Sequence, residues 1–421
     1  RQLVIRIYLQ QDEAESARTA MVKYQHDYAD ESSQQPVSTD WLILQARVQL
    51  NTGHPGRAID ILQQIETQDA LDVETLKWIA ELEHRPAIAA DVNQQMRERL
   101  DGQVLSRYQR WAYSYVAYMA SGIIRDVPSR ISNLESMLTI KLRIPLFDDD
   151  YQVSADDLWD LYDGYGTRLA NDMGLLFGSE QQWMKRSESL RAEHPEQALA
   201  LNVAWVLHGQ NFSDEKQHQA IVEILEARPS GLELINQLYL HSERVDDIDK
   251  LPDAVRYRLV DHALGEGDYE AAVALMKTLE EPPDGASLFD WRMRTARVMV
   301  LKGEYSESEQ LIRKTFAEKK SITHAELDRY IQVVFDFQTV QQHEIALRLF
   351  ALISMKGLED NLRRELYFWQ AESYMALKQY DRAALNYLES AYALKDGAND
   401  LWAQSARFKA GTALQEGAIY D

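Results

Sequence analysis

The chain of 421 residues contains no cysteine. This absence excludes disulfides, thiolate metal ligands and a cysteine nucleophile. It also suits an oxidising compartment, in which a free thiol can form wrong disulfides. We therefore expect a bacterial chain that is periplasmic or associated with the cell envelope, with the cytoplasm as the alternative.

Glycine and proline are scarce. The 18 glycines and 10 prolines together make up about half the share that these residues have in an average protein. So few breakers count against β-sandwiches, barrels and collagen-like or low-complexity chains, and they favour long helices. The apolar fraction of 45% supplies a core and excludes wholesale disorder.

Basic residues are in the minority, and long apolar runs are missing. The chain has 45 Lys and Arg against 67 Asp and Glu, a net charge of −22, which counts against nucleic acid as the main partner because phosphate binding relies on clustered basic residues. Two uncharged stretches, 111–124 and 197–213, contain polar residues and are shorter than the roughly 20 apolar residues of a membrane span. We expect no direct membrane span. Because the chain opens at Arg1 and shows no signal peptide, we expect a fragment of a longer product.

A short phrase recurs in the C-terminal half. Each copy has a turn residue, a tyrosine two positions later and a small residue three positions further on: Gly267-Asp-Tyr-Glu-Ala-Ala272, Gly303-Glu-Tyr-Ser-Glu-Ser308 and Lys378-Gln-Tyr-Asp-Arg-Ala383. A fourth copy, degenerate at the turn, reaches its small residue at Ala346, so the steps are 36, 38 and 37 residues. A fifth copy begins before Gly417, and its second helix would start near Asp421.

Apolar residues on either side of the phrase have helical spacing. Ala371, Tyr374 and Leu377 precede one copy, and Ala383, Tyr387 and Leu388 follow its turn. We interpret each copy as the turn between two antiparallel helices that approach closely at the small residues. One pair cannot bury its own apolar face, so neighbouring pairs must stack.

These residues resemble the tetratricopeptide repeat (TPR) family. The matching positions are Ala371, Tyr374, Tyr380, Ala383 and Tyr387, then Gly267, Tyr269, Ala272 and Met276, and towards the N-terminus Ala46, Gly53, Ala58 and Leu62. The periods exceed the 34 residues of the family, and its helix-ending proline is mostly absent. The resemblance implies an all-α fold, a right-handed superhelical α-solenoid of TPR-like antiparallel helix pairs. We expect N-terminal pairs over 1–70, divergent helical repeats over 71–250 and a C-terminal array over 251–421 whose last repeat is truncated.

The middle third keeps helical periodicity without the phrase. An aromatic stripe, Tyr108, Trp111, Tyr115 and Tyr118, predicts a helix packed into the core. Seven aspartates crowd an acidic linker near 145–155 and the residues up to 163, but Val153 and Trp159 stand where a calcium loop needs Gly and Glu. We therefore expect a solvated loop followed by an acidic helix start. Capping boxes are predicted at Ser154-x-x-Asp157, Ser179-x-x-Gln182 and Thr323-x-x-Glu326.

Motifs that carry chemistry are missing. The chain has no G-x-S-x-G elbow and no phosphate-binding G-x-x-x-x-G-K-[ST] loop. Gly164-Tyr-Gly166 continues to Leu169 where a dinucleotide loop needs Gly or Ala. No two of the ten histidines stand four residues apart, as a helical zinc pair requires. We expect no catalytic, cofactor or metal site.

In a helical-pair solenoid the first helix of each pair lines the inner wall, which commonly binds peptides or protein segments. With the TPR register, the inward positions of the predicted groove are Tyr257, Asp261, Met293, Arg297, Asp328, Phe335, Gln338, Phe368, Glu372 and Arg407. Aromatic side chains mixed with Arg and carboxylates are typical of recognition surfaces. Two other interpretations stay open: several of these residues belong to the core, or a neighbouring domain fills the groove.

We therefore expect a non-enzymatic protein–protein interaction scaffold or adaptor of TPR type, in an envelope assembly, whose partner is another protein or a peptide segment. One alternative is the helical arm of a cell-wall-acting enzyme, similar to a lytic transglycosylase, whose catalytic domain lies outside this chain. Another is a scaffold for polysaccharide export or secretion.

Overall fold

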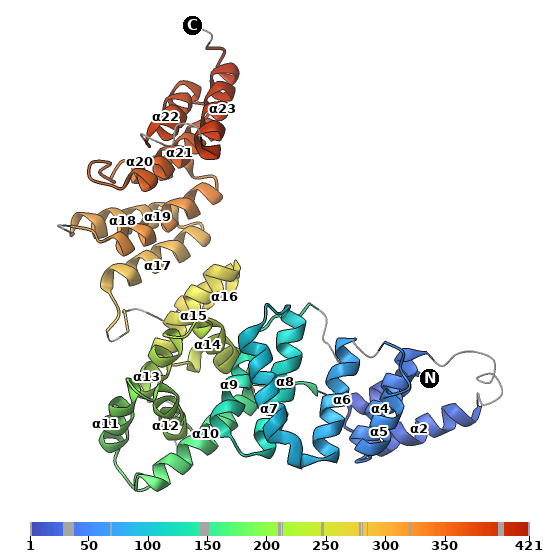
Figure 1. Ribbon diagram of the computed structural model, residues 1–421. Coiled ribbons are helices and arrows are strands. Elements are labelled where there is room, and N and C mark those ends of the chain that lie inside the picture. Colours follow the sequence, from blue (N-terminus) through green and yellow to red (C-terminus); the bar gives the residue numbers. More distant parts are fainter. Residues whose placement is uncertain are drawn as a thin grey trace. The chain divides into compact units, whose positions relative to one another are not determined.

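The computed structural model describes residues 2–27, 38–67, 70–143, 151–208, 212, 214–245, 248–277, 279, 281–283, 285–319, 321–394 and 400–419. Within these ranges every regular element is a helix and no strand occurs. The predicted all-α class is confirmed, and successive helices pack as neighbours (Figure 1). The right-handed superhelix stays a prediction.

The chain forms two compact units, Arg1–Arg258 and Leu259–Asp421, which we call unit 1 and unit 2. The division falls inside helix α15 (Asp253–Glu266), a few residues after the predicted start of the C-terminal array. Each unit is described by itself.

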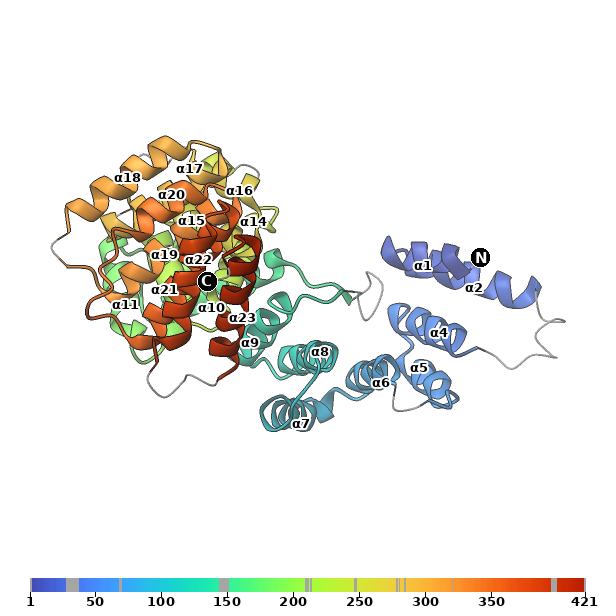
Figure 2. The same cartoon turned by 90° about the horizontal axis from the view of Figure 1, so that it is seen from above.

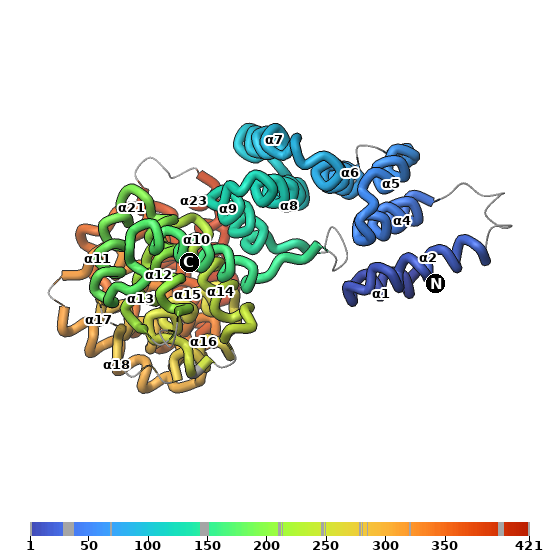
Figure 3. Tube along the Cα trace, turned by 90° about the horizontal axis from the view of Figure 1, so that it is seen from below, coloured from blue at the N-terminus to red at the C-terminus, as the bar shows by residue number. Residues whose placement is uncertain are grey.

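Unit 1 contains the helices up to the start of α15. They are α1 (Gln2–Gln10), α2 (Ala14–Asp27), α4 (Thr39–Asn51), α5 (Pro55–Leu62), α6 (Leu71–His84), α7 (Ala89–Gly102), α8 (Arg107–Ile123), α9 (Val127–Leu138), α10 (Ala155–Asp172), α11 (Glu180–Arg191), α12 (Pro195–Leu207), α13 (Glu215–Glu226) and α14 (Gly231–Leu240), with short 3₁₀ turns at Pro86–Ile88 and Ile248–Lys250. Figures 2 and 3 show α8 beside both α7 and α9, in agreement with their contacts.

Unit 2 continues from α15 in pairs of a first and a second helix. The helices are α16 (Tyr269–Met276), α17 (Leu288–Leu301), α18 (Tyr305–Ala317), α19 (His324–Thr339), α20 (His343–Phe350), α21 (Asp360–Ala376), α22 (Tyr380–Tyr392) and α23 (Leu401–Glu416). The tyrosines of the recurring phrase, Tyr269, Tyr305 and Tyr380, are each the first residue of a second helix.

The same turn joins the two helices of each pair. At Gly303 the N–H of Gly303 donates to the carbonyl of Val300 (3.0 Å), and the N–H of Glu304 donates to that of Met299 (2.9 Å). These bonds satisfy the last carbonyls of the first helix and place one residue in the left-handed region. The same bonds recur at the left-handed residues Asp12, Gly53, Arg125, Gly174, Gly267, Gln341 and Lys378, and across these eight turns φ lies between 58° and 82°.

A small residue stands five positions after the left-handed residue in most of these turns. The residues are Ala17, Ala58, Ala272, Ser308, Ala346 and Ala383, and each is 0% exposed. Ser308 donates a hydrogen bond from its hydroxyl to the carbonyl of Ala296 on the first helix of its pair, at 2.9 Å. The absence of a larger side chain lets the two helices of a pair approach closely at this point.

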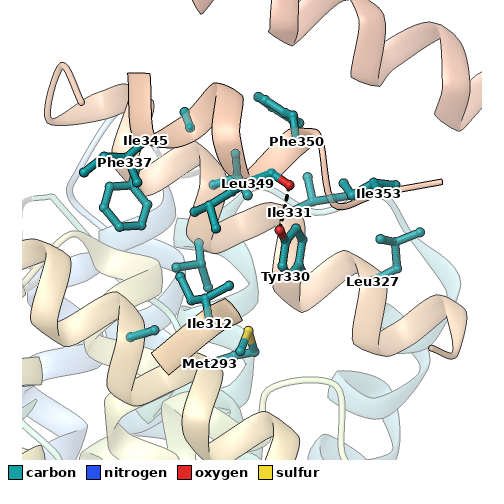
Figure 4. Packing of buried hydrophobic residues seen from close by; sticks show 14 of the residues in the cluster. Met293, Ile312, Leu327, Tyr330, Ile331, Phe337, Ile345, Leu349, Phe350 and Ile353 are labelled. Atoms are coloured by element: carbon teal, nitrogen blue, oxygen red, sulfur yellow. Dashed lines mark hydrogen bonds between the residues drawn. The ribbon is translucent and has the colours of Figure 1, made fainter. Parts of the chain in front are cut away.

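The core of unit 2 lies between successive pairs. Figure 4 shows Met293 of α17, Ile312 of α18 and Tyr330 of α19 packed with side chains of α20. The Tyr330 hydroxyl donates to the carbonyl of Leu349 at 2.7 Å, so the buried ring also satisfies its polar end. Each pair is therefore covered by its neighbours, as stacking requires.

Several predictions for the middle third of the chain are confirmed. All three capping boxes are present, at Ser154, Ser179 and Thr323. In the aromatic stripe of α8, Tyr115 is buried and stacks on Trp111 with ring centroids 5.4 Å apart, which confirms its core position. Asp148–Asp150 lie outside the described residues, so the expected acidic loop is not tested.

Of the two glycines Gly164 and Gly166, only Gly166 is required for helix packing. Both lie inside α10, where Gly166 faces α12 so closely that an added Cβ would stand 1.9 Å from the carbonyl oxygen of Ala200. An added Cβ at Gly164 would meet nothing within 4 Å. The G-x-G spacing thus reflects one close helix contact, and the dinucleotide loop is excluded here because it needs the turn that follows a strand.

We expect Gly166→Ala to destabilise unit 1 by about 3 kcal/mol or more, because the backbone of α12 cannot move aside. Gly164→Ala is the matched control on the same helix and should gain about 0.5–1 kcal/mol from helix propensity. Chemical denaturation measures both changes. Equal stability of the two variants would contradict the packing described here.

A buried histidine makes unit 1 sensitive to acid. The ring of His218 on α13 donates from Nε2 to the carbonyl of Phe212 (2.8 Å), and Nδ1 accepts from the Tyr239 hydroxyl (2.7 Å). Burial disfavours the charged ring and lowers the pKa of His218 to about 4. Because the unfolded pKa is about 6.5, the contribution of His218 to stability is complete above that pH and is lost as the pH falls towards 4.

We therefore expect the free energy of unfolding to fall by up to about 3 kcal/mol through this residue between pH 7.5 and pH 4. His218→Gln should remove that part of the pH dependence, whereas the exposed His241→Gln should keep it. Denaturation curves at several pH values test this, and a slope unchanged in His218→Gln would refute the assignment.

Candidate protein-binding site

Two residues of the predicted groove are buried and cannot contact a partner. Tyr257 and Met293 are each 2% exposed. Met293 lies in the core cluster with Ile312 of α18, because the second helix of the pair covers this position of the first helix. The prediction that these two side chains contact a partner is therefore wrong, and they belong to the core.

The polar residues of the groove link successive first helices. Asp261 on α15 accepts a bidentate contact from Arg294 on α17, with Nε at 2.6 Å. Arg297 on α17 donates to Asp336 on α19, from Nε at 2.6 Å and from Nη2 at 3.2 Å. Burial raises the pKa of Asp336 although Arg297 acts against this. These charges are occupied within the protein.

The links continue towards the C-terminus. Gln338 on α19 donates from Nε2 to the carbonyl of Trp369 (2.7 Å) and to the hydroxyl of Ser373 (2.6 Å) on α21. Glu372 on α21 accepts from the Tyr387 hydroxyl at 2.5 Å and pairs with Lys409 on α23. These side chains therefore hold neighbouring helices in register.

The remaining groove residues differ in their surroundings. Phe335 and Phe368 are half-buried, and Phe368 packs against Tyr387 and Trp402 with ring centroids 5.5 and 5.1 Å away. Asp328 is exposed beside His324, and Arg407 is half-buried. The structure thus brings the ten residues onto consecutive first helices, but few of them offer free surface.

The last two helices expose apolar side chains that the sequence analysis missed. On α23 Leu401 is 84% and Phe408 77% exposed. On α22, which packs against α23, Leu385 and Tyr392 are 60% and 61% exposed. The spacing of Leu401 and Phe408 by seven residues, and of Leu385 and Tyr392 likewise, was a signal available in the sequence.

The register of the turns explains the exposure on α23. Ten residues before the left-handed residue stand Met293, Ile331 and Phe368, which are buried or half-buried. The turn after α23 has the same two hydrogen bonds, and its left-handed residue is Ala418 with φ 51°. The matching residue of α23 is Phe408. Within the described residues, the last of which is Ile419, Phe408 is exposed.

A second position, counted back from the left-handed residue, is also buried in the preceding pairs and exposed on α23. Seven residues before the left-handed residue stand Ala296, Val334 and Ala371, each 0% exposed. The matching residue of α23 is Gly411, which is exposed, and a Cβ added there would meet nothing within 4 Å. Phe408 and Gly411, together with the exposed Leu401, form a surface that we call the α23 face. Phe408 and Gly411 stand at the two positions that are covered in the preceding pairs.

A scan against protein-family models and a search of curated proteins gave no match for this chain. Across the part of the chain that the structure describes, no group of three or more His, Asp or Glu side chains could hold a metal ion. None of the described helices combines the length and the apolar character needed to cross a bilayer.

Proposed function

We propose that this protein is a non-enzymatic scaffold whose α23 face binds an amphipathic helix of a partner protein. The observation that carries the proposal is the apolar surface that the last two described helices expose, which includes Leu385 on α22 and Leu401 and Phe408 on α23. Exposed apolar surface of this kind marks a protein interaction site. A helix laid against it can bury the apolar stripe, and the small Gly411 permits close approach.

Charge favours a partner that differs from the chain itself. Two copies would each bring a net charge of −22, and self-repulsion opposes their association. Exposed carboxylates on the same two helices, among them Glu389 and Glu416, favour basic residues at the flanks of the bound helix. The partner expected is therefore an amphipathic helix with a small residue at its centre and basic ends.

We also propose that the pairs are of TPR type and that the scaffold acts in the cell envelope. The recurring turn, the tyrosine at the start of three second helices and the buried small residue support the first part. The absence of cysteine supports the second.

Photo-crosslinking at Phe408 tests the proposed docking site. A chain with Phe408→p-benzoylphenylalanine, irradiated in an extract of its source cells, should form an adduct with a different protein. The same substitution at Phe177, an exposed residue of unit 1, should not form it. Mass spectrometry of the adduct should locate an amphipathic helical segment with basic flanks. A dimer of this chain, or no adduct specific to Phe408, would refute the proposal.

A companion variant separates docking from folding. Gly411→Leu fills the position at which a partner helix approaches, and its side chain has open space in the free chain. We expect it to abolish the Phe408 adduct while the melting temperature is kept. Gly164→Leu on α10, also in open space, is the matched control and should leave the adduct unchanged.

A further inference from the structure

Unit 1 contains a polar cavity that the scaffold function does not use. It lies between α7, α8 and α9, where α8 contacts both of the other helices (Figures 2 and 3), and has a volume of about 470 Å³. A second cavity of about 630 Å³ shares four lining residues with it, among them Ser132 and Ser136, and continues along α9. Both volumes are in the range of small-molecule sites, about 300–1,000 Å³.

The lining of the first cavity is built from three helices at helical spacing. Asn93 and Asp101 come from α7, Arg110 and Ser114 from α8, and Ser132 and Ser136 from α9. Its few apolar lining residues include no aromatic ring. Aromatic rings are what sugars and flat apolar ligands stack on, so this lining favours a small ligand rich in hydrogen-bonding groups.

Asn93 presents a polar group to the cavity. Its residue is 6% exposed, and within the described ranges its side-chain amide has no hydrogen-bond partner. The amide is not one of the fully buried polar atoms that lack a partner, so it is accessible from the cavity. Because Asn93 lines the cavity, a bound molecule can supply the missing acceptor and donor.

The lining of the cavity contains charged side chains of both signs. Arg97 is engaged, since it donates to the Ser129 hydroxyl at 2.8 Å and lies 3.8 Å from Asp126. Arg110 and Asp101 are exposed residues at the rim of the cavity, and neither has an ion pair among the described residues. The site therefore offers one free cation and one free anion. An overall charge of −22 further disfavours a ligand that is itself an anion.

We infer that this cavity binds a small zwitterion, namely an amino acid or short peptide with free termini. The carboxylate of the ligand accepts from the Arg110 guanidinium, and its ammonium group donates to Asp101. Asn93 and the Ser114 hydroxyl bind polar groups between the termini. The inference rests on unit 1 alone and does not depend on the α23 face.

Calorimetric titration with triglycine tests the assignment of each terminus. We expect triglycine to bind, and both N-acetyl-triglycine and triglycinamide to bind at least tenfold more weakly, because each lacks one charge. Arg110→Gln should erase the difference between triglycine and its amide, and Asp101→Asn should erase the difference between triglycine and its acetylated form. Asn93→Ala should weaken all three probes.

Matched controls come from exposed residues of the same helices. Arg107→Gln on α8 and Asp91→Asn on α7 lie outside the lining and should leave binding unchanged. Melting temperatures of all variants show that each one folds. Three results would each overturn the inference. They are no binding of triglycine at concentrations up to 10 mM (a binding free energy weaker than about 2.7 kcal/mol), equal binding of the three probes, and an Arg110→Gln variant that still binds triglycine more tightly than triglycinamide. Success or failure of the crosslink at Phe408 has no bearing on this result.

Discussion

The close approach of two helices at a small residue is the contact on which the paired architecture depends. A left-handed residue reverses the chain, and five positions later Ala or Ser lies fully buried against the first helix. A larger side chain at Ala346 or Ala383 would separate the helices and open the stack behind them. Since each pair touches mainly its neighbours, stability is the sum of these local contacts and of the contacts between pairs.

The contacts between pairs decide which residues remain for a partner. The chain places opposite charges on successive first helices, such as Arg297 and Asp336, and so uses its inner polar residues to hold the stack together. Among the described residues, apolar surface is exposed on the last two helices, α22 and α23. Binding specificity is thus expected to come from Phe408 and Gly411, which stand at positions that are covered in the pairs α17–α18, α19–α20 and α21–α22.

The sequence predicted the local features well, because turn residues, capping boxes and small contact residues act over a few positions. Gly303, Tyr305 and Ser308 lie where the phrase placed them. The groove was harder to predict, because the Asp261 carboxylate is occupied by Arg294, which stands 33 residues away on another helix. The cavity lined by Asn93 depends on three helices meeting, which no spacing in the sequence reveals.

Amide hydrogen exchange across unit 2 tests most directly whether the α23 face is open to a partner helix. Amides of α23 are expected to exchange much faster than those of α19, which is covered by its second helix and by the next pair. A bound partner helix should bring α23 towards the protection of α19. Equal protection of α23 and α19 in the free chain would contradict the account.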